Sequence, residues 1–147
     1  ANDAHHLSAP APDGAAARAA VLTALADAGL DAGAVSYVNA HGTGTVLNDR
    51  MEAALLAGLV GDKVPVSSTK SMTGHLMGAS GAVESAVCVQ AVRTGTVPGT
   101  RNCVTLADDC AGIDVVRGEP RRFPVSAALN VNFGFGGYNA ALLFGPA

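Results

Sequence analysis

The sequence is poor in aromatic and charged residues. It contains no tryptophan, two tyrosines and four phenylalanines, and charged residues make up 14% of its 147 positions. The 9 Lys and Arg residues against 12 Asp and Glu residues give a net charge of −3 and form no basic cluster, which argues against a nucleic-acid partner. With 49% hydrophobic residues, the chain is expected to build a globular core from alanine, valine and leucine.

The sequence also lacks the features of membrane, secreted and disulfide-stabilised proteins. It has no apolar run of about 18 residues and no basic segment followed by an apolar one at its amino end. Its three cysteines, Cys88, Cys103 and Cys110, form no C-x-x-C pair. We therefore expect a cytoplasmic protein with reduced thiols. The first residue is Ala1 rather than methionine, and the opening segment is typical of the interior of a longer polypeptide.

Alanine-rich helical segments alternate with short β-branched segments, which predicts an α/β fold with a mostly parallel sheet and one domain over residues 1–147. The first helix follows breakers at 10, 12 and 14, and the second is predicted from capping-box spacing between Asp49 and Glu52. Helices are expected at residues 15–28, from 48 or 49 to 61, and at 78–93. Strands are expected at residues 35–39, 64–68, 113–116, 125–130 and 138–144, with a loop over 98–114.

Two histidines lie in polar, glycine-containing segments that follow predicted strands. His41 belongs to Asn-Ala-His-Gly-Thr-Gly-Thr at 39–45, and His75 ends Ser-Ser-Thr-Lys-Ser-Met-Thr-Gly-His at 67–75. The carboxyl ends of parallel strands meet at one edge of a sheet, so the two imidazoles are expected to converge there. Imidazole is suited to proton transfer and hydrogen-bond donation near neutral pH. The sequence therefore predicts a reactive site around this pair.

Several residues around the histidines are open to two interpretations. Lys70 and Glu84 could form an ion pair that anchors a charge near the imidazoles, or a solvated surface pair. Either histidine could be structural, and Gly42 could serve only a turn. The histidine and cysteine spacing predicts no metal site, no phosphate-binding loop motif is present, and no cysteine has a neighbour that would activate it as a nucleophile.

Three segments together resemble the carboxyl-terminal signatures of the β-ketoacyl synthases, the condensing enzymes of fatty-acid and polyketide synthesis. They are residues 39–45, residues 67–75 and Asn-Phe-Gly-Phe-Gly-Gly at 132–137. The resemblance implies the C-terminal half of a thiolase-like fold, layered α-β-α-β-α in the whole enzyme, with a mixed five-stranded sheet. It also implies that this chain begins just after the first strand of that half. The N-terminal half, which would carry the active-site cysteine, is expected elsewhere.

The resemblance implies a catalytic role for both histidines. His41 and His75 would complete a Cys-His-His constellation and donate hydrogen bonds to the malonyl thioester carbonyl as carbon dioxide leaves, stabilising the enolate. Lys70 is counted with them as catalytic, and it would form a supporting ion pair with Glu84. Phe135 would supply a gating ring and an oxyanion-hole N–H.

The resemblance also implies the substrates and partners. Thr43, Thr45 and Ser8 would bind the phosphopantetheine arm of an acyl carrier protein, which carries the acyl substrates, and the chain itself would hold no cofactor and no metal. The expected partners are the cysteine-bearing half, the acyl carrier protein and a dimeric ketosynthase or ketosynthase/chain-length-factor assembly.

Three positions depart from the family pattern Asn-Ser-Phe-Gly-Phe-Gly-Gly-Thr-Asn: Val131 and Asn132 replace the first pair, and Tyr138 replaces the threonine. Both histidines are retained, which disfavours a purely structural partner. The favoured hypothesis is decarboxylative Claisen condensation of an acyl thioester with malonyl-acyl carrier protein, with the cysteine on a partner chain or N-terminal segment. The alternatives are a noncatalytic scaffold or chain-length-factor-like subunit, and a standalone acyl-binding module with its own nucleophile.

Overall fold

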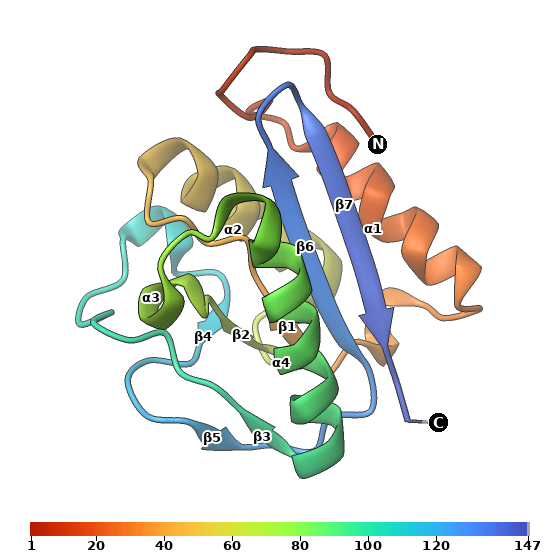
Figure 1. Cartoon of the computed structure of the whole chain (residues 1–147), viewed down its shortest axis with the longest axis vertical. Helices are drawn as coiled ribbons and strands as arrows, with labels where there is room; N and C mark the ends of the chain where they lie inside the picture. The colour runs from red at the N-terminus through yellow and green to blue at the C-terminus, as the bar shows by residue number, and fades with distance from the viewer. Residues whose placement is uncertain (147) are drawn as a thin grey trace.

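The computed structural model describes residues 1–146 and shows a five-stranded sheet with helices on both faces (Figure 1). The strand order is β4-β2-β1-β6-β7, with the first four parallel and β7 antiparallel to β6. The prediction of a mixed five-stranded sheet is confirmed. The strands of this sheet are β1 (Tyr37–Asn39), β2 (Pro65–Ser67), β4 (Asp114–Val115), β6 (Ala128–Gly134) and β7 (Tyr138–Phe144).

The long helices divide between the two faces of the sheet. Helices α1 (Ala15–Asp27) and α2 (Val46–Val60) cover one face, and α4 (Ser80–Thr94) covers the other, where it lies along β6 (Figure 1). The short helix α3 (Lys70–Thr73) follows β2. No helix within residues 1–146 is long and apolar enough to cross a membrane.

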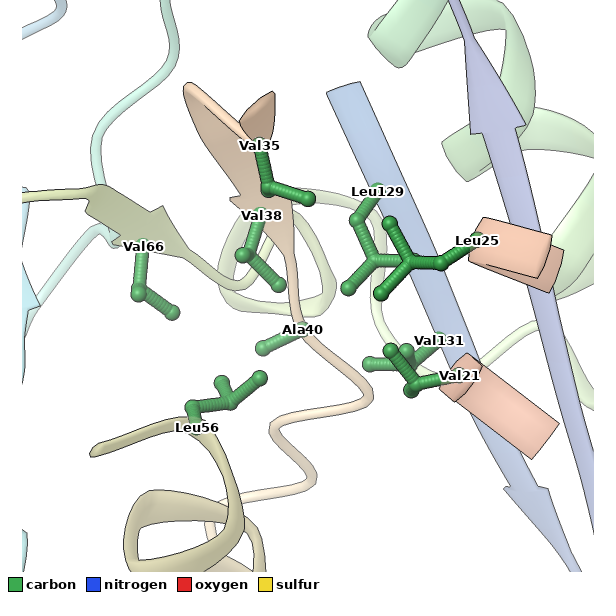
Figure 2. Close-up of a cluster of buried hydrophobic side chains, with 9 residues drawn as sticks. All are labelled: Val21, Leu25, Val35, Val38, Ala40, Leu56, Val66, Leu129 and Val131. Atoms are coloured by element: carbon green, nitrogen blue, oxygen red, sulfur yellow. The ribbon is translucent and has the colours of Figure 1, made fainter. Parts of the chain in front are cut away.

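The nine buried side chains of the main core cluster on the α1 and α2 side are all aliphatic. Figure 2 shows side chains from β1, β2 and β6 pointing toward Val21 and Leu25 of α1 and Leu56 of α2. Val21 and Leu25 are four residues apart and therefore lie on the same face of α1. Each fully buried side chain of this size stabilises the fold by about 1.5–3 kcal/mol. This packing fixes α1 and α2 against the sheet and so fixes the segment that joins β1 to α2.

Three observed boundaries differ from the predicted ones because tertiary contacts outweighed local signals. Helix α2 begins at Val46 rather than at Asn48 or Asp49, because Glu52 turns inward to the backbone of residues 41 and 42 instead of capping the helix. Strand β6 runs to Gly134 through full pairing with β7, so 132–134, predicted as loop, are strand. The predicted loop around His75 contains α3 and a 3₁₀ turn, Met77–Ala79, so α4 begins at Ser80 instead of residue 78.

A second, two-stranded sheet was not predicted. Strand β3 (Thr96–Val97) pairs antiparallel with β5 (Arg121–Arg122) below the end of α4 (Figure 1). These strands have two residues each, too few to leave a period-2 pattern in the sequence. The helix predicted at 15–28 and the strands at 138–144 and 113–116 are confirmed within two residues at each end.

Candidate functional site

A pocket of about 990 Å³ lies at the carboxyl ends of β1 and β6, where the two histidine segments meet. His41 follows β1, and His75 follows α3, so different segments bring the two rings to one place. Their ring centroids are 5.6 Å apart and the planes are nearly perpendicular, at 86°. The predicted convergence of the two histidines is confirmed. The two rings differ in exposure, because His41 is buried and His75 is exposed.

The backbone around His41 is held by a buried carboxylate. Glu52 Oε1 accepts the backbone N–H of His41 at 2.7 Å, and Oε2 accepts that of Gly42 at 2.8 Å. Asn48, one helical turn before Glu52, donates its side-chain amide to Oε2 at 3.1 Å. Ser68 Oγ donates to the carbonyl oxygen of Gly42 at 2.7 Å. The segment that carries His41 is therefore fixed by helix α2 and by the residue after β2.

Glycine is required at position 42. Its φ is +43°, and a Cβ there would lie 2.5 Å from the Cβ and 2.7 Å from the Oγ of Ser68. Neither the backbone conformation nor the space admits a side chain without displacement. Gly42 thus has a structural role in the motif. It lets the backbone pass close to Ser68, and His41 is thereby presented to the pocket.

Burial gives His41 and Glu52 unusual protonation behaviour. Burial, with the nearby charge of Lys70 and the ring of His75, lowers the pKa of His41 to about 3. His41 is therefore neutral at physiological pH. Burial raises the pKa of Glu52 to about 7, while its hydrogen bonds from Gly42 and His41 act in the opposite direction.

The neutral tautomer of His75 is selected by a nearby backbone N–H. The N–H of Met77 donates to His75 Nδ1 at 3.0 Å. A backbone N–H can only donate, so Nδ1 must carry a lone pair, and in the neutral ring the proton lies on Nε2. Ser80 Oγ lies 3.3 Å from the same Nδ1. His75 is thereby held as a hydrogen-bond donor through Nε2.

Lys70 and Glu84 form a buried ion pair beneath the histidines. Lys70 Nζ lies 2.5 Å from Glu84 Oε1, and the two side chains are only 5% and 2% exposed. The surface-pair interpretation is therefore wrong. The pair links the start of α3 to α4 and places a positive charge near His41. Removing one partner of such a pair leaves an uncompensated buried charge.

The other predicted site residues line the same pocket. Thr43, Thr45 and Ser8 all face it, and the hydroxyls of Thr43 and Thr45 lie 2.8 Å apart. Phe135 lies at its rim and is 72% exposed, in the tight turn between β6 and β7. Six of the eight residues singled out in the sequence thus line this pocket. Lys70 lines a neighbouring pocket that also includes His75, and Glu84 is buried against Lys70.

Sequence reasoning missed three residues of this site. Glu52 was assigned to a helix cap, although its spacing of four residues from Asn48 could have indicated a shared inward face. Phe133 was placed in a loop, but it packs its ring edge-on against His41 at 5.5 Å. Asn132 was noted only as a departure from a motif and lines the pocket beside His41.

Two of the three cysteines lie in environments that disfavour the thiolate. Cys88 is fully buried, and burial raises the pKa of its thiol to about 12, so it is a poor nucleophile. Burial also raises the pKa of Cys110. Within residues 1–146, no group of three or more histidine, cysteine or acidic side chains is arranged to hold a metal ion.

Comparison with known proteins identifies the class to which this fold and site belong. Residues 1–104 match the family described as the β-ketoacyl synthase, C-terminal domain. The 3-oxoacyl-[acyl-carrier-protein] synthase 2 of Synechocystis is 45% identical over 145 residues, which are 97% of this chain and 35% of that protein. The chain spans about a third of the length of this curated relative.

Two solved ketosynthase structures share the fold. An ishigamide ketosynthase/chain length factor structure has a TM-score of 0.93 at 34% identity and covers 99% of this chain and 36% of its own. A type II PKS acyl-carrier protein in complex with its ketosynthase, bound to the hexaketide, has a TM-score of 0.95 at 30% identity over 100% of this chain and 36% of its own.

The chain therefore belongs to the β-ketoacyl synthase family and corresponds to its C-terminal domain. Its fold is the corresponding part of the thiolase-like architecture of the ketosynthases.

Proposed function

We propose that this chain provides the histidine half of a β-ketoacyl synthase, which condenses an acyl thioester with malonyl-acyl carrier protein in fatty-acid or polyketide synthesis. The observation that carries the proposal is the pairing of a buried, neutral His41 with His75 at 5.6 Å in one pocket. The nucleophilic cysteine comes from the N-terminal half, on the same original chain or on a partner.

The reaction needs hydrogen-bond donors rather than acids at this position. When the carboxylate of the malonyl group leaves as carbon dioxide, the electrons of the broken carbon–carbon bond form an enolate, and its charge settles on the thioester oxygen. Two imidazole N–H groups aimed at that oxygen stabilise it. A neutral His41 donates a hydrogen bond without transferring a proton, so the enolate keeps its nucleophilic carbon. That carbon then attacks the acyl thioester on the cysteine and releases the thiolate.

The hydroxyls at the pocket mouth suit the carrier arm. Phosphopantetheine presents amide groups that donate and accept hydrogen bonds, and Thr43, Thr45 and Ser8 offer hydroxyls along one side of the pocket. No charged side chain is needed to bind such an arm. We assign these three residues to the acyl carrier protein's prosthetic group, which enters as part of the substrate.

Large exposed apolar side chains around the pocket support the proposal that a partner covers this face. Val46, Leu47, Met77 and Phe135 line the pocket and are 61–72% exposed, and Leu7, at 78%, adjoins the β6–β7 turn through its backbone. Clustered exposed apolar groups are unusual on a free surface and mark interaction sites. We assign this face to the cysteine-bearing half of the enzyme.

The decisive experiment is reconstitution. The chain and a cysteine-bearing ketosynthase half are mixed with acyl- and malonyl-acyl carrier protein, and 3-oxoacyl product is measured by mass spectrometry. We expect product only from the mixture, and none when the cysteine of the partner half is replaced by alanine. Failure of a stable, stoichiometric complex to condense would contradict the proposal.

A chain-length-factor-like role is the second candidate, because one similar structure contains a ketosynthase with its chain length factor. In that role the chain would be required for the assembly while His41 and His75 could both be replaced without loss of condensation. The same reconstitution with the double variant separates the two functions.

A further inference from the structure

The neighbouring pocket is a separate cavity of about 520 Å³ beside the segment that carries His41. It lies between α2, β2, β4 and the loop that follows β3, which passes beside α3 (Figure 1). Thr43 and His75 are the two residues that line both pockets. The volume is within the range of about 300–1,000 Å³ that is typical of small-ligand sites, and no step of the proposed condensation uses it.

The floor of the neighbouring pocket is aliphatic. Two of its side chains, Leu56 and Val66, belong to the main core (Figure 2). The aliphatic residues that line it are Ala53, Leu56, Val66, Leu106, Ile113 and Val115. Burial of a hydrocarbon chain on such a surface strengthens binding about fourfold for each methylene group. This floor therefore suits a ligand with an aliphatic chain.

Hydroxyl groups on the walls of the neighbouring pocket are bonded within the fold. Ser68 Oγ donates to the carbonyl oxygen of Gly42 at 2.7 Å, and Ser71 Oγ donates to the carbonyl oxygen of Ser68 at 2.8 Å. Thr100 Oγ1 accepts the backbone N–H of Ser68 at 3.0 Å. The walls are therefore held in place by the fold itself.

Four charged side chains line the neighbouring pocket, and three of them have partners in the fold. Asp49 accepts one backbone and one side-chain N–H, and both carboxylate oxygens of Glu52 accept backbone N–H groups. Lys70 is paired with Glu84. The fourth, Arg101, is exposed and takes part in none of the ion pairs within residues 1–146. Its guanidinium is the charged group that a ligand can pair with.

The backbone places Arg101 at the rim of the neighbouring pocket. Its N–H donates to Ser71 Oγ of α3 at 2.8 Å. The next residue, Asn102, has a φ of +62°, in the left-handed region that asparagine adopts more readily than most residues. Arg101 and Cys103, on either side of this turn, both line the pocket. The backbone at the rim is thus fixed, while the guanidinium remains available.

We propose that the neighbouring pocket binds an aliphatic carboxylic acid of medium chain length, with its chain on the floor and its carboxylate on Arg101. The planar guanidinium matches a carboxylate through two parallel hydrogen bonds. Asp49 and Glu52 also line the pocket, so a head with one negative charge fits better than a dianion such as a phosphate monoester. This site lies outside the histidine pocket and goes beyond the proposed function, on which it does not depend.

The sequence provides a reporter on the floor of the pocket. Ile113 is its only isoleucine, so ¹³C labelling of isoleucine methyl groups gives one residue to follow by NMR. Decanoate is titrated into the chain, and we expect a saturable shift of the Ile113 methyl signals with NOEs to the ligand chain. Decanoate should bind about fifteenfold more tightly than octanoate because it buries two more methylene groups. Decanol, which has no carboxylate, should bind about tenfold more weakly than decanoate.

Two pairs of variants locate the head and the chain of the ligand. Arg101→Ala should weaken decanoate binding about tenfold and leave decanol binding unchanged, whereas Arg18→Ala, which removes an exposed arginine of α1, should change neither. Leu106→Ala should weaken the binding of both ligands. Its control is Val104→Ala, on the same loop, because Val104 is 84% exposed and does not line the pocket.

Several results would overturn the proposal. They are the absence of a saturable Ile113 shift, equal decanoate affinity in Arg101→Ala and the parent, and equal affinities of decanoate and decanol. A shift of the Met77 methyl signal without one at Ile113 would place the acid in the histidine pocket instead. Loss of the Ile113 shift in the complex with the cysteine-bearing half would also overturn it, since that half would then close the pocket.

Discussion

The two histidine segments of this chain are held in opposite ways. The His41 segment, residues 40–45, is fixed by contacts distant in sequence, from Glu52 and Ser68, and its histidine is buried. The His75 segment, residues 70–77, is fixed mainly by local hydrogen bonds and an ion pair at its start, and its histidine is exposed. The chain therefore fixes the backbone that carries the buried His41, whereas the exposed ring of His75 is oriented by a local backbone N–H and is covered by the proposed partner half.

The largest effect is expected when the ion pair between Lys70 and Glu84, at the start of the His75 segment, is broken. Lys70→Met leaves Glu84 as a buried charge with no partner cation, which should lower the free energy of unfolding by about 3–5 kcal/mol. The double variant Lys70→Met/Glu84→Gln should recover much of that loss, because the uncompensated charge is removed. Urea denaturation of the three proteins measures this, and equal stability of single and double variants would contradict the account.

The next largest effect is expected at Gly42, where the backbone of the His41 segment comes close to Ser68. Gly42→Ala places a methyl group within 3 Å of Ser68 at a φ of +43°, and should cost about 2–3 kcal/mol and displace His41. Gly44→Ala is the matched control: its φ is +74° but nothing lies within 4 Å, so it should cost only about 1 kcal/mol. Equal midpoints for the two variants in thermal unfolding would show that the contact with Ser68 does not matter.

His41 and Glu52 should make opposite contributions to the pH dependence of stability. Glu52 has a raised pKa, so the fold binds its proton more tightly and stability falls as pH rises from 4.5 to about 7. His41 has a lowered pKa, so its contribution is present above pH 6.5 and is lost as pH falls toward about 3. Between pH 4.5 and 6.5 the two slopes oppose each other, each by about 1.4 kcal/mol per pH unit.

Replacing either Glu52 or His41 should therefore reveal how the other residue alone changes stability with pH. Stability measured from pH 4.5 to 6.5 should rise more steeply with pH in Glu52→Gln than in the parent, and should fall relative to the parent in His41→Ala. Parallel curves for all three proteins would mean that neither pKa differs between the folded and unfolded states.

The smallest expected effect concerns the local support of His75. Ser80→Ala removes a hydroxyl that accepts the N–H of Leu76 at 2.9 Å and lies 3.3 Å from His75 Nδ1. The loss should be about 1 kcal/mol in unfolding free energy, because Met77 still holds the ring. A loss as large as that of Gly42→Ala would show that the His75 segment is more tightly fixed than its contacts indicate.

The sequence predicts the layers of this fold and the position of its site well, and its fine structure less well. Helix α1 could be bounded by the breakers before it and by Gly29 after it, and both histidine segments follow parallel strands, so convergence could be inferred from topology. Glu52 could not be assigned in the same way, because its position three residues after Asp49 fits a capping box until the fold places residues 41 and 42 beside it. The hydrogen bonds from the Asn130 side-chain amide to Gly81 and Ser85 depend on how α4 packs against β6, which no local sequence pattern specifies.

The central claim is that both histidines stabilise the enolate, and malonyl decarboxylation by the reconstituted enzyme tests it most directly. His41→Ala and His75→Ala, at matched complex stoichiometry, should each lower the rate of carbon dioxide release about 10²- to 10³-fold, the loss typical of one oxyanion donor. His5→Ala, which removes an exposed histidine, should retain the parent rate. Retention of the parent rate in either active-site variant would contradict the account.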